Sequence, residues 1–153
     1  MQHANDASYL LQHVASLLAK HSDQILQEQL GIGYAQLKLL LTLQSKPELK
    51  QRDIAHGLGQ TEASISRQVK LMIRQGLLHV TINPKNRREH LATVTAKGMN
   101  LTDAALAVLQ KSHQSMYVAL GSKGQEQLSE LLDQLHAQVC EVTTSHLARL
   151  SMD

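Results

Sequence analysis

The stretch QRDIAHGLGQTEASISRQVKLMIRQGLL, residues 51–78, decides the fold of this chain. We expect a short helix over 51–58, and Gly59 follows it at the place where helices commonly end on a left-handed glycine. Thr61 is a fair N-cap for a second helix over 62–75. Two helices joined by so tight a turn form the helix-turn-helix layout, in which the second helix enters the major groove of DNA.

The second helix is predicted to have one apolar and one polar side. Its apolar side carries Ile65, Val69, Met72 and Ile73 at helical spacing. We expect DNA-binding residues on the other side and at the helix start: Gln60, Thr61, Ser64, Arg67, Lys70 and Arg74. Arg67 lies near the helix N-terminus and is the best candidate for bidentate contact with guanine, whereas Lys70 and Arg74 are better placed for phosphates.

Beyond this helix the hydrophobic period changes to that of strands. Residues 78–82 and 90–94 are short runs rich in strand formers, and the polar segment 83–88 separates them, which predicts a β-hairpin. The expected tip carries three basic residues: Lys85, Arg87 and Arg88. An arginine on a projecting hairpin can enter a narrow minor groove. A helix-turn-helix followed by a basic hairpin predicts a winged DNA-binding module.

Helices are expected on both sides of this module. Residues 6–30 form the first, with Leu10, Val14 and Leu17 on one face, and residues 34–43 form a second that is apolar nearly all round. After the hairpin, a helix over 96–120 ends before Gly121, and Ser122 with Gln125 forms a capping box for the last helix. That helix carries a heptad-like series: Leu128, Leu132, Leu135, Val139 and Val142. Such a series indicates packing against another helix, and a second subunit can supply it.

The predicted fold class is mainly α with a small β-hairpin wing. We expect one domain over residues 1–153, built from a winged helix-turn-helix module over 33–98 and helical dimerisation regions over 1–30 and 99–153. The composition agrees, because aromatic residues make up only 2% of the chain, which leaves a core of aliphatic residues and methionine. The same scarcity argues against a protein that stacks single-stranded bases on aromatic side chains.

The charge distribution favours a polyanion as partner. Nine basic and three acidic residues lie between Lys50 and Lys97, which gives this segment a charge of +6 in a chain whose net charge is only +2. A solvated basic face is the other interpretation of the same pattern. The chain has one cysteine, no apolar run long enough to span a membrane, and no basic leader at its start. We therefore expect a cytoplasmic protein without membrane contact.

Several of these segments together resemble the MarR family of multiple-antibiotic-resistance regulators. The resemblance rests on AQLKLLLTL, IAHGLG, ASISRQVKLMIRQGLL and NPKNRREHLATVTAKG, the last of which is similar to the wing signature, and on ALGSKGQEQLSELLDQL near the last helix. It implies a sequence-specific, double-stranded DNA-binding transcriptional regulator that binds a pseudo-palindromic operator as a homodimer. By position, Arg88 resembles the wing arginine that enters the minor groove, and Ser64, Ser66 and Arg67 resemble recognition-helix contacts.

The chain departs from the family pattern at three positions, and these departures bear on the operator sequence rather than on the class. Asn86 replaces the wing aspartate, and Lys50 is a poor cap for the helix that it precedes. Glu62 suits a helix N-terminus but would be repelled by phosphates unless it accepts from a cytosine amino group.

The resemblance also implies a sensor, for which three interpretations stay open. A pocket for a small aromatic or phenolic effector, whose binding would release a repressor from DNA, is expected to be lined by Tyr9, His13, Leu17, Tyr34 and Met116. A redox sensor would use Cys140, one turn after His136. A metal sensor is disfavoured because the nine histidines show no metal-ligand spacing. We expect no metal and no other cofactor.

The function class also has an alternative. Winged-helix modules serve as protein-interaction domains without DNA binding. An enzyme is not expected, because the chain has no nucleophile elbow, glycine-rich phosphate loop or metal-ligand cluster.

Overall fold

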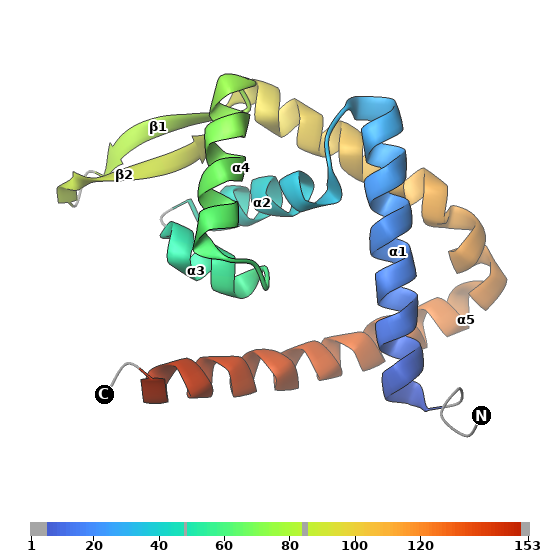
Figure 1. Cartoon of the computed structure of the whole chain (residues 1–153). Helices are drawn as coiled ribbons and strands as arrows, with labels where there is room; N and C mark the ends of the chain where they lie inside the picture. The colour runs from blue at the N-terminus through green and yellow to red at the C-terminus, as the bar shows by residue number, and fades with distance from the viewer. Residues whose placement is uncertain (1–5, 48, 84–85, 151–153) are drawn as a thin grey trace. The chain divides into compact units, whose positions relative to one another are not determined.

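The computed structural model describes residues 6–47, 49–83 and 86–150 (Figure 1). Its elements are α1 (Ala7–Leu30), α2 (Tyr34–Ser45), α3 (Gln51–Gly57), α4 (Glu62–Arg74), β1 (Leu78–Asn83), β2 (Asn86–Val94) and α5 (Ala96–Leu150). The predicted order of helices and hairpin is confirmed, and so is the fold class. The chain divides into two compact units, Met1–Lys111 and Ser112–Asp153, which are described separately below.

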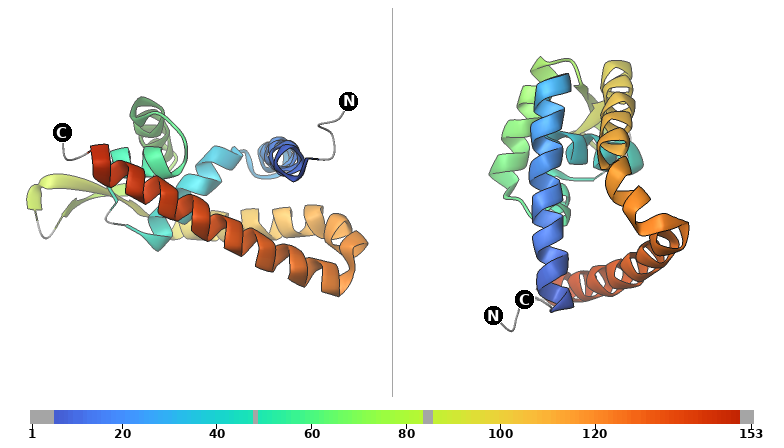
Figure 2. Two further views of the ribbon diagram at one scale, coloured as in Figure 1. Left: turned by 90° about the horizontal axis from the view of Figure 1, so that it is seen from below. Right: turned by 90° about the vertical axis from the view of Figure 1, so that its right-hand side faces the viewer.

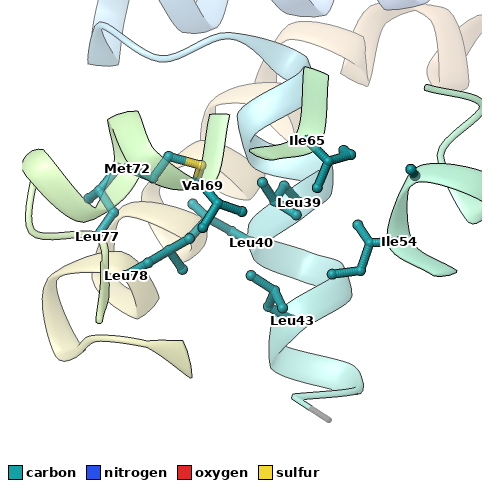
Figure 3. Packing of buried hydrophobic residues seen from close by; sticks show 10 residues of the cluster. Leu39, Leu40, Leu43, Ile54, Ile65, Val69, Met72, Leu77 and Leu78 are labelled. Carbon is teal, nitrogen blue, oxygen red and sulfur yellow. The ribbon is translucent and has the colours of Figure 1, made fainter. Parts of the chain in front are cut away.

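The core of the first unit lies where α2, α3, α4 and the start of the hairpin meet. Figure 3 shows Leu39, Leu40 and Leu43 of α2 pointing toward side chains from α3, α4 and β1. The buried partners of these leucines are Ile54, Ala55, Ile65, Val69, Met72, Leu77 and Leu78. An apolar helix such as α2 is stable only when most of its surface is covered, and here three elements cover it.

A second buried cluster joins the end of α1 to α2 and to the beginning of α5. It consists of Leu26, Ile32, Leu37 and Ala105. A hydrogen bond also joins α1 to α2, because Asp23 of α1 accepts the backbone N–H of Tyr34 at 2.8 Å. Asp23 thus caps the N-terminus of α2 from outside that helix, where a carboxylate also favours the helix dipole.

The N-terminal half of α1 does not contribute to either buried cluster. The buried residues of α1, Ser22 and Leu26, both lie in the second half of the helix. The predicted apolar face is present, but Leu10, Val14 and Leu17 remain 43–54% exposed. In Figure 1 this end of α1 extends away from α2, α3 and α4, so these elements leave the face uncovered.

The hairpin is longer than predicted. The expected polar turn over 83–88 is wrong in part, because β2 already begins at Asn86, and Arg87 and Arg88 belong to the strand. The register shifts between Ile82, which pairs with His90, and Asn83, which pairs with Asn86. A β-bulge of this kind absorbs extra residues in one strand, so a pattern that counts only apolar alternation places the strand start too late. Figures 1 and 2 show the hairpin projecting away from the helices of the module.

The predicted break at Gly121 is confirmed. α5 is interrupted there, because Gly121 has φ 65° and ψ 169°, outside the helical region. Gln125, which we expected in a capping box with Ser122, donates from Nε2 to the carbonyl oxygen of Tyr117 at 2.6 Å. Its side chain therefore satisfies a carbonyl at the end of the preceding helical segment.

The second unit contains the predicted heptad-like series. Four members, Leu128, Leu132, Leu135 and Val139, are 38–64% exposed in the single chain. The side chain of the fifth, Val142, lies outside the described residues. The described part of the series therefore forms an exposed apolar stripe on one helix.

Candidate nucleic-acid interface

The turn between α3 and α4 has the geometry that a helix-turn-helix requires. Gly59 has φ 62°, in the left-handed region that glycine adopts without steric cost. The backbone at the next residue stays close to α3, because the N–H of Gln60 donates to the carbonyl oxygen of Ala55 at 2.8 Å. Lys50 precedes α3 without capping it through its side chain, which confirms that it is a poor cap. Thr61 caps α4, because its side chain accepts the N–H of Ser64 at 3.2 Å.

The two sides of α4 differ as the sequence predicted. Ile65, Val69 and Met72 are buried against α2, α3 and the hairpin start, each at most 3% exposed. The exposed residues on the other side are Ala63, Arg67, Lys70, Leu71 and Arg74. Because Ala63, Arg67, Lys70 and Arg74 follow one another at spacings of four, three and four, they form one stripe along the helix. Ser66 lies half-buried beside the core face, and Glu62 is exposed at the helix start.

The cations of α4 are not neutralised by neighbouring acids. Within the described ranges, the structure gives Arg67, Lys70 and Arg74 no ion pair, and all three side chains are exposed. On α3, by contrast, Arg52 lies 3.7 Å from the carboxylate of Asp53. Unpaired cations on one side of a helix produce a local positive potential that attracts polyanions.

A hydrogen-bonded chain of polar side chains runs along the start of α4. The Oε1 atom of Gln60 accepts from Ser64 Oγ at 3.2 Å and from Gln68 Nε2 at 2.7 Å. Sequence reasoning named Gln60 and Ser64 but missed Gln68. Part of the signal was available, since Ser64 and Gln68 are spaced by four and so share one side of α4, and Gln60 directly precedes the Thr61 cap.

The base of the hairpin is held against both neighbouring helices. Thr95 caps α5 by accepting the N–H of Gly98 at 3.0 Å, and its hydroxyl donates to the carbonyl oxygen of Gly76 at 2.7 Å. Lys97 donates to the carbonyl oxygen of Gln75 at 2.8 Å, just beyond the end of α4. At Gly98 a Cβ atom would lie 2.3 Å from the carbonyl oxygen of Leu77. Only glycine fits there, so the wing has a closely packed base.

The basic wing residues are only partly covered by the structure. Lys85 lies outside the described residues. Arg87 and Arg88 have their backbone in β2, but their side chains, like that of Asn86, lie outside what the structure describes. Their contacts with DNA therefore remain predictions.

A second polar connection joins the start of α2 to the end of α4. Gln36 accepts the N–H of Gly33 at 2.9 Å and donates from Nε2 to the side-chain oxygen of Gln75 at 3.3 Å. Together with Asp23, these contacts link α1, α2 and the end of α4 through a few side chains.

The structure places the predicted effector residues in three locations. Tyr9 and His13 stack with ring centroids 5.6 Å apart, on the exposed half of α1 that also carries Leu17. Tyr34 packs against the cluster around Leu26. Met116 belongs to the second unit. The pocket therefore remains a prediction.

The two other sensor candidates are a redox-active cysteine and a metal site. The side chain of Cys140 lies outside the described residues, so its redox role also stays a prediction. Across the described ranges, no three His, Cys, Asp or Glu residues form a group that could hold a metal ion. Among those same residues, no helix is both long enough and apolar enough to cross a membrane.

Comparison with known proteins points to one family. Residues 30–89 match a family model described as the MarR family. These residues include α2, α3, α4 and β1, the elements that carry the predicted helix-turn-helix. No protein of curated function matches the sequence.

Solved structures share the fold. MarR, in a crystal structure, has a TM-score of 0.78 and 18% identity, covering 88% of this chain and 94% of its own. CouR from Rhodococcus jostii RHA1, bound to p-coumaroyl-CoA, has a TM-score of 0.71 and 22% identity, covering 86% and 92%. MepR of S. aureus, in complex with DNA, has a TM-score of 0.67 and 24% identity, covering 86% and 97%.

Proposed function

We propose that this chain, in which residues 30–89 match the MarR family model and which has the winged-helix fold, is a transcriptional regulator that binds double-stranded DNA sequence-specifically as a homodimer. The operator would be pseudo-palindromic, since a two-fold dimer presents the same helix to two half-sites about one helical turn apart. The protein would act as a repressor that a small effector releases.

The observation that carries this proposal is the division of α4 into two faces. Three side chains anchor it in the core, and the opposite stripe presents Arg67, Lys70 and Arg74, which have no ion pair in the described structure. A helix held rigidly by one face and cationic on the other meets the requirements of a helix that lies in the major groove. The core of a protein–protein interface is instead depleted of charged residues, so a stripe with three cations fits a protein-interaction module less well.

The roles of the cations follow from their positions. Arg67 is one helical turn from Ala63 near the start of α4, so it is assigned to a base edge, and Lys70 and Arg74 are assigned to phosphates. Arg88 of β2 is assigned to the minor groove beside the half-site.

The dimer is proposed from the apolar side chains that the single chain leaves exposed. These lie on the first half of α1 and along the stripe from Leu128 to Val139. Exposed apolar stripes of this kind on soluble chains mark interaction surfaces. A second copy would cover both without any further partner.

The effector is proposed to be a small aromatic or phenolic molecule. Its support is the stacked, exposed pair of Tyr9 and His13, which offers an aromatic surface together with hydrogen-bonding groups. The solved structure of CouR with p-coumaroyl-CoA shows that this fold can hold an aromatic acyl ligand.

Selection from random-sequence duplexes tests the proposal. The protein should enrich a two-fold symmetric motif, and log K against log salt for the best duplex should fall with a slope of roughly 0.9 per phosphate contacted. Sedimentation equilibrium at micromolar concentration should give a dimer mass. An enriched pool without any common motif would exclude sequence-specific regulation, and a monomer mass would exclude the symmetric operator.

A further inference from the structure

The polar chain at the start of α4 has a feature that the proposed function does not use. Gln60 Oε1 accepts two hydrogen bonds, from Ser64 Oγ and from Gln68 Nε2. An amide oxygen has two lone pairs, and both are therefore occupied inside the protein. The remaining hydrogen-bonding group of this side chain is the NH₂ of Gln60, which can only donate.

The orientation of the two amides follows from the burial of Gln68. Its Oε1 atom is buried and has no hydrogen-bond partner among the described residues. Reversing both amides would place the NH₂ group of Gln68, with two N–H donors, at this buried position. The observed orientation leaves one acceptor there without a partner, whereas the reversed orientation would need acceptors for two donors, so we take the observed one as the basis of the argument.

We propose that Gln68 is a positioning residue that fixes Gln60 as a pure donor toward DNA. A glutamine that reads adenine must donate to N7 and accept from N6 at the same time. Gln60 cannot accept, because its oxygen is already occupied. It therefore favours a base edge that offers acceptors only, guanine O6 and N7 or thymine O4. Adenine can still accept at N7, but its N6 amino group would find no acceptor on Gln60, and cytosine presents only the N4 donor, so both are disfavoured. This inference rests on the proposed function and specifies how one position of the operator is read.

The effect of Gln68 on the stability of the module also supports a positioning role for this residue. A buried acceptor without a partner destabilises a protein, and an apolar side chain of the same size would avoid that cost. Gln68 therefore lowers the stability of the folded module, and the same side chain restrains Gln60. Methionine has a similar volume and no amide, so Gln68→Met removes the restraint and the buried acceptor together and should fold at least as stably as the wild type.

The test compares base preference at one operator position. Gln60→Ala first identifies that position, as the base pair at which preference is lost. Wild-type protein should bind the guanine or thymine duplex at least about fivefold more tightly than the adenine duplex, the lower end of the range for one good base contact. Gln68→Met should reduce this ratio to under about twofold, and in a Gln60→Ala background it should change nothing further. Gln44→Met, the same replacement on an exposed part of α2, should keep the wild-type ratio.

Gln60→Glu gives a second test that does not depend on any change at Gln68. One carboxylate oxygen keeps the bonds to Ser64 and Gln68, and the other faces DNA as an acceptor, so preference should shift to cytosine, whose N4 donates. Both Gln60 variants and Gln68→Met should melt within a few degrees of the wild type or above it.

Three results would overturn the inference while leaving the proposed function intact. These are a wild-type preference for adenine at the Gln60 position, a Gln68→Met variant with an unchanged preference, and a Gln68→Met variant that weakens all four duplexes by the same factor. If wild-type protein enriches no motif, the proposed function fails, and this inference fails with it.

Discussion

Two regions of this molecule each place three leucines on a helix and have opposite environments. Leu39, Leu40 and Leu43 of α2 are at most 2% exposed in the module core. Leu128, Leu132 and Leu135 of α5 are 38–49% exposed. Helical periodicity predicts that the apolar face of a helix must be buried, but it does not predict whether residues of the same chain bury it. The first region is covered by α3, α4 and β1, and the second is exposed in the single chain, where we propose that a second copy covers it.

Truncating a leucine in each region should give the clearest contrast. Leu40→Ala should lower the free energy of unfolding by about 3–4 kcal/mol, because it opens a cavity in a fully packed core. Leu132→Ala should instead raise the dimer dissociation constant by more than about tenfold, since a leucine side chain contributes roughly 1.5–3 kcal/mol when buried.

Chemical denaturation at several protein concentrations, with sedimentation equilibrium, separates these effects. If Leu132→Ala changes neither the dimer mass nor the concentration dependence of unfolding, the exposed stripe is not part of a dimer interface.

The base of the wing should be nearly as sensitive as the core. Gly98→Ala places a Cβ atom 2.3 Å from a backbone oxygen that cannot move aside easily, so we expect a loss of about 2–3 kcal/mol. Gly57→Ala is the matched control, because Gly57 lies in α3 with nothing within 4 Å, and it should stabilise by roughly 0.4–1 kcal/mol. Thermal unfolding of both variants checks this, and equal melting temperatures would contradict the close packing.

On α4 the comparison is between two exposed cations. Arg67→Ala should cost about 1–3 kcal/mol per half-site on the correct operator and flatten the preference at one base pair in each half. Lys70→Ala should weaken all duplexes by about the same factor. Titration against operators changed one base pair at a time distinguishes the two roles. Proportional weakening by Arg67→Ala would make it a backbone contact and would transfer readout to Ser64, Ser66 or Glu62.

The smallest effect is expected at the boundary within α1. Asp23 lies where the exposed half of the helix gives way to the buried half, and it caps α2. Asp23→Ala should destabilise the module by about 1 kcal/mol, whereas Asp23→Asn keeps an acceptor and should cost only a few tenths. Urea denaturation measures both, and identical losses would show that the cap hydrogen bond is not the cause.

Some features of the candidate site followed directly from local sequence. The Thr61 cap, the turn at Gly59 and the inward set of Ile65, Val69 and Met72 depend on interactions within a few residues, so spacing alone predicts them. The exposed stripe of cations follows from the same periodicity, as the opposite side of the wheel.

Other features could not be read from spacing because they involve residues far apart in the chain. The cap that Asp23 provides for Tyr34 and the close approach of Gly98 to Leu77 depend on how elements pack together. The start of β2 at Asn86 was missed because a register shift belongs to the pairing of two strands, and neither strand shows it alone.

The sequence by itself determined the class of the molecule: helices with a winged helix-turn-helix, a basic middle and apolar faces that require cover. It did so because helix caps, glycine turns and hydrophobic periods are local properties. Only the tertiary structure decided which apolar faces are covered within the chain, and that Gln68 holds Gln60 beside Ser64. Burial and the direction of a hydrogen bond depend on all neighbouring elements at once, and no window of sequence contains them.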